Sequence, residues 1–285
     1  MKKLLFLLIL CVGGGFVSAA ECPAEQDTLL SALSAQLRRN FKTLKKLRPP
    51  VYYMSYQLYE TSAFQANAKA GALQFSITDD SGAVDISARV GSVHTDNTHE
   101  LKGTYTNTDL VSVQVPLARR DSLALRNALW RGTQAAVENA QQEYNRVLSN
   151  KQVSAENMDT SDDFALPQKN VFCQEEKTFE YNRAEIEERL KRLSLQGEKY
   201  DFVDESAFAF RLERINTYFV DSVGNRIFTS RAFGRYILSV QARNPDGMDL
   251  ERNMIYDGVK AEDFPTEETM AADLERMAQE LKALK

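Results

Sequence analysis

Segments in which apolar residues alternate with polar ones constrain this chain most strongly. From Val84 to Val90 every second residue is apolar, and residues 110–116 repeat the pattern. Because successive side chains of a strand point to opposite faces, each segment predicts a strand with one buried face. Short turn-forming segments separate the predicted strands. They favour antiparallel pairing, since parallel strands need long crossovers.

The predicted strands extend over much of the chain. They occupy residues 52–58, 63–78, 84–90, 110–116, 206–220, 226–231, 235–243 and 252–257. Clusters of Asp, Ser, Asn, Pro and Gly predict turns at Asp79–Gly82, Ser222–Asn225 and Pro245–Gly247.

Apolar residues spaced three and four apart predict helices at 26–47, 121–149, 183–195 and 266–284. Asn182 and Glu185 form a capping pair for the third helix. Trp130, on the long second helix, is interpreted as a buried anchor. The outer face of the first helix carries five cations, Arg38, Arg39, Lys42, Lys45 and Lys46. This face is read as a solvated surface, and contact with a polyanion is the alternative.

These elements predict an α+β protein with antiparallel sheets flanked by helices, among them one long helix and a C-terminal amphipathic helix. A first α+β region covers residues 21–120. A middle α+β region covers 121–265 and contains a polar linker near 150–170. Residues 266–285 form the C-terminal helix.

Charge and hydropathy limit the partners of the chain. The formal net charge is -5 and the pI about 5.3, which disfavours binding to nucleic acid or to anionic membranes. Beyond the N-terminus no segment has the ~20 consecutive apolar residues that a membrane span requires. We therefore expect neither a nucleic-acid partner nor a membrane span.

Residues 1–20 have the pattern of a secretory signal peptide. Lys2 and Lys3 precede the apolar segment Leu4–Val12, and Ser18-Ala19-Ala20 provides a cleavage site. We predict an exported protein of the periplasm or cell envelope.

Export affects the interpretation of the cysteines. After removal of the signal peptide the chain retains Cys22 and Cys173. In an oxidising compartment these two residues form either a disulfide or two separate thiols. A disulfide would join the mature N-terminus to the middle of the chain.

Five segments, in the same order and at similar spacing, resemble the TldD/PmbA-type metallopeptidase family over residues 45–285. They are Pro50–Tyr56, Val84–Gly91 with Asp96–His99, Ala124–Trp130, Val220–Asn225 and Asn244–Met248. The resemblance implies mixed α and antiparallel β regions that help to enclose a substrate passage. In that family a C-terminal half supplies the zinc site through an H-E-x-x-x-H motif and a Cys ligand. This sequence ends at Lys285 without that half, so we expect no zinc ligand, no catalytic residue and no cofactor in the chain.

Two groups of residues are candidates for binding. Tyr53, Tyr56 and Tyr59 either line a peptide groove or pack within the sheet. His94 and His99, five residues apart, are a weak metal candidate, and a solvent-facing or capping role is the preferred interpretation.

The C-terminal helix offers a third candidate surface, a stripe of apolar residues for docking a partner. It consists of Met270, Leu274, Met277, Leu281 and Leu284. The leading hypothesis is a non-catalytic half that helps to shape a substrate channel, or docks onto a separate chain bearing a zinc-peptidase domain. Self-association is an alternative partner arrangement. A free-standing binding module of the cell envelope is the alternative function.

Overall fold

Four long strands organise the molecule. They are β1 (Val51–Lys69), β2 (Ala72–Ser92), β6 (Glu205–Asp221) and β7 (Arg226–Arg243). The computed structural model describes residues 22, 24–101, 110–115, 122–153 and 161–284. Shorter strands are β3 (Thr95–Asp96), β4 (Leu110–Val115), β5 (Val171–Cys173) and β8 (Asp249–Gly258). The helices are α1 (Ala24–Leu44), α2 (Ser122–Val153), α3 (Arg183–Gly197) and α4 (Glu267–Leu284), with a 3-10 turn η1 at Ala261–Asp263.

Among the described residues, the strands form one eight-stranded sheet in the order β3-β2-β1-β6-β7-β5. β4 adds to β2, and β8 adds to β7. Every pair is antiparallel except β5 with β7. The predicted α+β class, with its antiparallel sheet, long helix and C-terminal helix, is confirmed. The ranges predicted as first and middle regions meet within this sheet, where β1 pairs with β6 along its length.

The long strands correct three sequence predictions. The turn predicted at 79–82 lies inside β2, and the chain reverses instead at Ala70 and Gly71, both of which have positive φ. The predicted strand 63–78 therefore extends across a hairpin. The predicted strands 226–231 and 235–243 form the single strand β7.

The turn prediction failed because strands of 17 to 21 residues far exceed the usual length of about five or six. Asp79 and Asp80 are tolerated because they lie on an exposed segment of β2, where β4 begins to pair only from Gly82. Polar and charged side chains are common on such edges.

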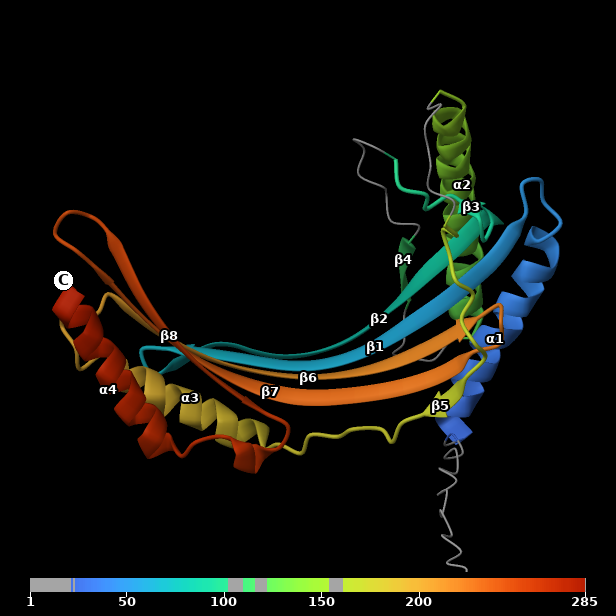
Figure 1. The fold of residues 1–285 in the computed structure, drawn as a ribbon. Helices are drawn as coiled ribbons and strands as arrows, with labels where there is room; N and C mark the ends of the chain where they lie inside the picture. Colours follow the sequence, from blue (N-terminus) through green and yellow to red (C-terminus); the bar gives the residue numbers. More distant parts are fainter. Residues whose placement is uncertain (1–21, 23, 102–109, 116–121, 154–160, 285) are drawn as a thin grey trace, which may run out of the picture.

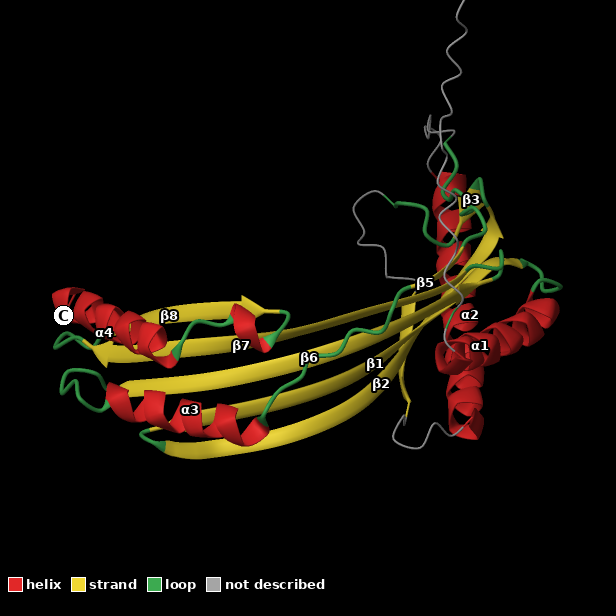
Figure 2. Cartoon of the chain, turned by 90° about the horizontal axis from the view of Figure 1, so that it is seen from below, coloured by secondary structure: helices red, strands yellow, loops and turns green. Residues whose placement is uncertain are grey.

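All four helices cover the same face of the sheet. On β1 the side chains of Met54, Tyr56 and Leu58 pack under α1 and α2, and those of Phe64 and Ala66 pack under α3 and α4. These residues have the same parity along an unshifted register, so they share one face, the covered face. Figure 1 shows the bent sheet with α3 and α4 beneath it, and Figure 2 shows this face from below.

The covered face holds two apolar cores separated by polar residues. The α1/α2 core lies at one end of the strands, and the α3/α4 core lies at the other. Between them lies a polar belt made of Glu60, Ser62, Arg214, Asn216 and Ser230. The strap, residues 174–182, crosses this belt from β5 to α3 (Figure 1). In the strap, Glu176 accepts a hydrogen bond of 2.8 Å from Asn216.

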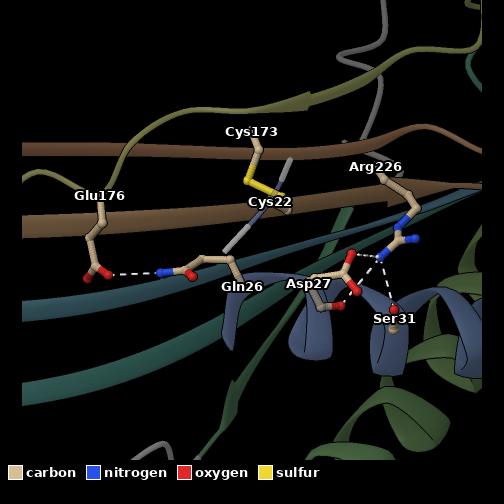
Figure 3. Close-up of a disulfide and its surroundings, with 7 residues drawn as sticks. All are labelled: Cys22, Gln26, Asp27, Ser31, Cys173, Glu176 and Arg226. Atoms are coloured by element: carbon tan, nitrogen blue, oxygen red, sulfur yellow. Dashed lines mark hydrogen bonds and ion pairs between the residues drawn. A yellow bond between two sulfur atoms is a disulfide. The ribbon is translucent and has the colours of Figure 1, made fainter. Parts of the chain in front are cut away.

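A disulfide joins Cys22, just before α1, to Cys173 in β5, with 5.3 Å between the two Cα atoms (Figure 3). Polar contacts surround it. The Arg226 guanidinium pairs with Asp27 at 2.8 Å and donates to Ser31 at 2.9 Å. These contacts fix the start of α1 to β5 and to the beginning of β7.

The predicted helices occur close to their expected bounds. Asn182 caps α3 by accepting a hydrogen bond from the Glu185 amide, as predicted. α2 continues to Val153, beyond its predicted end, into the range predicted as a linker. Residues 161–170 of that range form neither helix nor strand. The predicted signal peptide, residues 1–20, lies outside the described residues. No helix in the described part of the chain has the length and apolarity to cross a membrane.

Candidate functional site: the open face of the sheet

The face opposite the helices, called here the open face, has no helix of the described chain packed across it. The 19 residues of β1, at about 3.3 Å each, make a surface about 60 Å long. The strands bend along their length, so this face of the sheet is curved (Figure 1). A partner chain or an extended peptide would lie along it without displacing any described helix.

Aromatic, aliphatic and small polar side chains mix along the middle of the open face. Most are half-buried. They come from β1 (Ser55, Gln57, Tyr59, Thr61), β6 (Ile215, Thr217, Phe219) and β7 (Ile227, Thr229, Phe233). Such a mixture supplies apolar area together with hydrogen-bonding groups and is typical of surfaces that contact polypeptides.

Tyr59 lies at the centre of this surface. Its hydroxyl accepts a hydrogen bond from the side-chain amide of Gln57, and the charges of Asp85 on β2 and Arg231 on β7 act on it. Burial, and then the negative charge of Asp85, raise the pKa of Tyr59 above its ordinary value. A side-chain hydrogen bond with Asp85 adds to the rise, so the phenol stays protonated at neutral pH and is already engaged with that carboxylate.

The α1/α2 end of the open face is covered by the chain itself. The ring of Phe164 packs on Tyr53 at 4.9 Å between ring centroids, and the Arg89 guanidinium lies 3.9 Å from the same ring. Phe164 is held by a backbone hydrogen bond from its amide to Val93. The accessible part of the open face therefore ends at Phe164.

A buried ion pair lies beneath Phe164. Arg89 Nη1 is 2.8 Å from Asp96 Oδ2, and the side chain of Asp96 is fully buried. The Tyr52 hydroxyl donates to the same oxygen at 2.5 Å. Burial alone would raise the pKa of Asp96, yet hydrogen bonds from Tyr52, Thr98 and Arg89 hold it below its ordinary value. Asp96 is therefore ionised and fully satisfied at neutral pH.

Polar residues in the motifs that resemble the family stabilise a turn and the end of a strand. Asn97 accepts a 2.7 Å hydrogen bond from the amide of Val90 and so fixes the end of β2. Asp221 accepts hydrogen bonds from the amides of Val223, Gly224 and Asn225, each at 2.9 Å, in the β6–β7 turn. Gly224 has a φ of 107° there, which favours glycine. The side chains of Asn97 and Asp221 therefore make their hydrogen bonds within the fold.

The two histidines contact different aspartates. His94 pairs with Asp162, and His99 Nδ1 lies 2.6 Å from Asp163 Oδ1. Asp163 also accepts a hydrogen bond from the Asp96 amide. Among the described residues no three His, Cys, Asp or Glu side chains are grouped to hold a metal ion. In the structure both histidines tie the 161–164 segment to the β2–β3 region.

The three tyrosines of the predicted groove do not line one surface. Tyr56 faces the α1/α2 core, where its hydroxyl lies 2.6 Å from Thr133 Oγ1. Tyr53 is buried beneath Phe164, and its hydroxyl donates to Asp221 at 3.2 Å. Only Tyr59 lies on the accessible open face. Because side chains alternate between the two faces of a strand, the sequence spacing alone places Tyr56 on the opposite face from Tyr53 and Tyr59.

The predicted docking stripe on α4 is largely buried in the folded chain. Met270, Leu274, Met277 and Leu281 pack into the α3/α4 core, and Leu284 alone is exposed, at 51%. An amphipathic helix next to a sheet buries its apolar stripe against that sheet. A partner can reach only Leu284 of this set while the fold is intact.

Comparisons with known proteins return solved structures and nothing else. No family model and no curated protein matches the sequence. Similar solved structures include a candidate modulator of a DNA gyrase from Thermotoga maritima (15% identity, TM-score 0.46) and TldE from Thermococcus kodakarensis (12%, 0.48). A candidate modulator of DNA gyrase from Bacteroides thetaiotaomicron shares 10% identity with a TM-score of 0.47. The alignments cover 86%, 87% and 90% of this chain, and 47%, 47% and 50% of the others, so it spans about half their length.

Proposed function

We propose that this chain is a non-catalytic half of a TldD/PmbA-like zinc peptidase. Its open face would form one wall of a peptide passage that a separate zinc-bearing chain completes. The observation that carries the proposal is the long open face, across which no described helix packs and which has Tyr59 at its centre. The ordered sequence motifs that resemble the family support it.

We further propose that the chain is exported and works in the periplasm or cell envelope. The signal-like residues 1–20 support this location. The Cys22–Cys173 disulfide supports it independently, because such bonds persist in oxidising compartments.

Site-specific crosslinking in the native host tests the role of the open face. A photoreactive phenylalanine analogue replaces Thr61 or Thr229, which are half-buried on the open face. A third variant carries it at Glu188, an exposed position on α3 and a matched control. We expect the two open-face variants to capture a zinc-peptidase chain and the control to capture none. Peptidase activity should require both chains.

The alternative function, a free-standing envelope binding module, makes a different prediction in the same experiment. Open-face crosslinks to a protein or peptide that carries no zinc site would favour it. A chain that purifies as a monomer and yields no open-face crosslink would contradict both functions.

A further inference from the structure

A groove separate from the open face lies between α1 and α2. It encloses about 700 Å³, and residues of both helices line it. Figure 2 shows the two helices crossing at one end of the sheet. Trp130, expected from the sequence to be buried, lines the groove and is 59% exposed, and Leu123 is 58% exposed. Large apolar side chains exposed together in a concave surface indicate a site for a ligand.

The position of Trp130 follows from how α2 packs. Its neighbour Leu129 enters the α1/α2 core together with Ala136 and Ala140. Trp130 therefore lies on the flank of the helix, away from the sheet. This is the single Trp of the chain. Trp and Arg are the residues most enriched at the energetically dominant points of protein interfaces.

The floor of the groove is fixed by hydrogen bonds. Asn40 donates to the Tyr56 hydroxyl at 2.8 Å and to Thr133 Oγ1 at 3.2 Å. Tyr56 and Thr133 also bond to each other at 2.6 Å. These contacts join α1, α2 and β1 at one point, so the groove is formed before any ligand arrives. A preformed site avoids part of the ordering cost of binding.

The charge of the groove identifies its ligand. Arg39 on α1 and Arg126 on α2 line it together with one acid, Glu138, whose carboxylate accepts a 2.9 Å hydrogen bond from Gln134. α1 and the residues after it carry six cations and no acid from Arg38 to Arg48. This local charge opposes the net charge of -5 for the whole chain. An acidic ligand is therefore attracted to this surface, while most of the molecule repels it.

We propose that the α1–α2 groove binds an acidic amphipathic helix of a partner protein. The walls are two helices whose lining residues recur at three- and four-residue steps, which suits a third helix lying between them. Its apolar side chains would contact Trp130 and Leu123, and its carboxylates would pair with Arg39 and Arg126. The proposal concerns the covered side of the molecule and does not depend on a zinc-peptidase partner at the open face.

Fluorescence of Trp130 tests this proposal directly, because the chain has no other Trp. The probe is a synthetic Glu/Leu peptide of about 18 residues, roughly five helical turns, with its leucines on one face. The controls are a scrambled peptide of the same composition and a version with Lys in place of Glu. The purified full chain with its disulfide intact is titrated with each. We expect a blue shift of Trp130 emission and saturable binding with the acidic amphipathic peptide alone.

Paired variants locate the site. Arg39→Glu with Arg126→Glu should weaken binding about tenfold. Arg38→Glu with Arg131→Glu makes the same charge change on the same helices outside the groove and should keep the affinity within about twofold. Leu123→Asp, an exposed substitution at the groove, provides a second test that leaves the core intact and should also weaken binding.

Three results would overturn the proposal. In the first, the scrambled peptide binds as well as the amphipathic one. In the second, the two double variants lose the same amount of affinity. In the third, anionic phosphatidylglycerol vesicles would shift Trp130 emission while the peptide does not, which would assign the surface to a membrane.

Discussion

The two ends of the sheet share the same strands but are stabilised by different interactions. The α1/α2 end combines its apolar core with a disulfide, the buried Arg89–Asp96 pair and the Asp221 turn. The α3/α4 end depends on clustered rings, with Phe210 lying 4.5 Å from Tyr236 and 5.9 Å from Phe264. Directional contacts fix geometry, whereas apolar packing stabilises in proportion to area. The end with the disulfide also contains the groove with the exposed Trp130.

The polar belt determines how far the two ends are independent. It interrupts the apolar packing on the covered face, so the two cores are connected through the strands and the strap. Continuous strands favour unfolding in one cooperative step, whereas separate cores favour two steps. Variants at each end distinguish these cases.

Core truncation at each end should give the largest effect. Phe210→Ala removes a ring from the α3/α4 core, and Phe228→Ala removes one from the α1/α2 core. Both side chains are almost fully buried, and they lie on adjacent strands. Each substitution should cost about 3 to 5 kcal/mol of unfolding free energy. Denaturant unfolding followed by Trp130 fluorescence and by circular dichroism measures both.

The two probes decide between one and two cooperative units. Trp130 reports on the α1/α2 end, and circular dichroism reports on the whole chain. If the strands couple the ends, both probes shift together in both variants. If Phe210→Ala moves the circular dichroism transition and leaves the Trp130 transition unchanged, the ends are separate units and the belt divides the fold.

The disulfide should have the next largest effect. Cys22→Ala with Cys173→Ala removes a link between residues 151 positions apart. The loss should be about 2 to 4 kcal/mol, because a long loop is no longer closed in the unfolded state. The Trp130 transition should shift, since α1 is tied to β5 by this bond. In the wild-type protein reduced with dithiothreitol, the same shift is expected, and an unchanged transition in both samples would refute the role of the bond.

The sequence predicts the elements of this fold better than their lengths. Alternation identified β6 and the later half of β2, and periodicity placed all four helices. The hairpin at Ala70–Gly71 was missed because Asp79–Gly82 has stronger turn chemistry than the site where the chain reverses. Local composition cannot report that β2 continues past those residues as an exposed strand. Only the register with β1 determines this.

Binding surfaces were harder to predict, because exposure depends on distant contacts. The α4 stripe was assigned from helical spacing and Trp130 was interpreted as a buried anchor, and the exposure of both differs from expectation. The apolar stripe of α4 packs into the α3/α4 core. In the α1/α2 core the buried side chain is Leu129 rather than Trp130. Segment 161–164, far from β1 in the sequence, covers Tyr53. No short-range pattern contains that information.

The smallest expected effect concerns the belt itself. Burial raises the pKa of Glu60 above its ordinary value, and the charge of Glu176 adds to this, although Tyr218 donates a 2.8 Å hydrogen bond to its carboxylate. A raised carboxyl pKa in the folded state means that stability falls as pH rises from the unfolded pKa through the folded one. Glu60→Gln removes this loss and keeps an acceptor for Tyr218. We expect the variant to be slightly more stable than wild type at about pH 7, and to show little difference near pH 4.

Glu175→Gln, at an exposed position in the strap, is the control and should change stability at neither pH. The free energy of unfolding of each variant is measured at both pH values. If Glu60→Gln is less stable than wild type at pH 7, the expectation is wrong, because the ionised Glu60 carboxylate then stabilises the polar belt between the two cores.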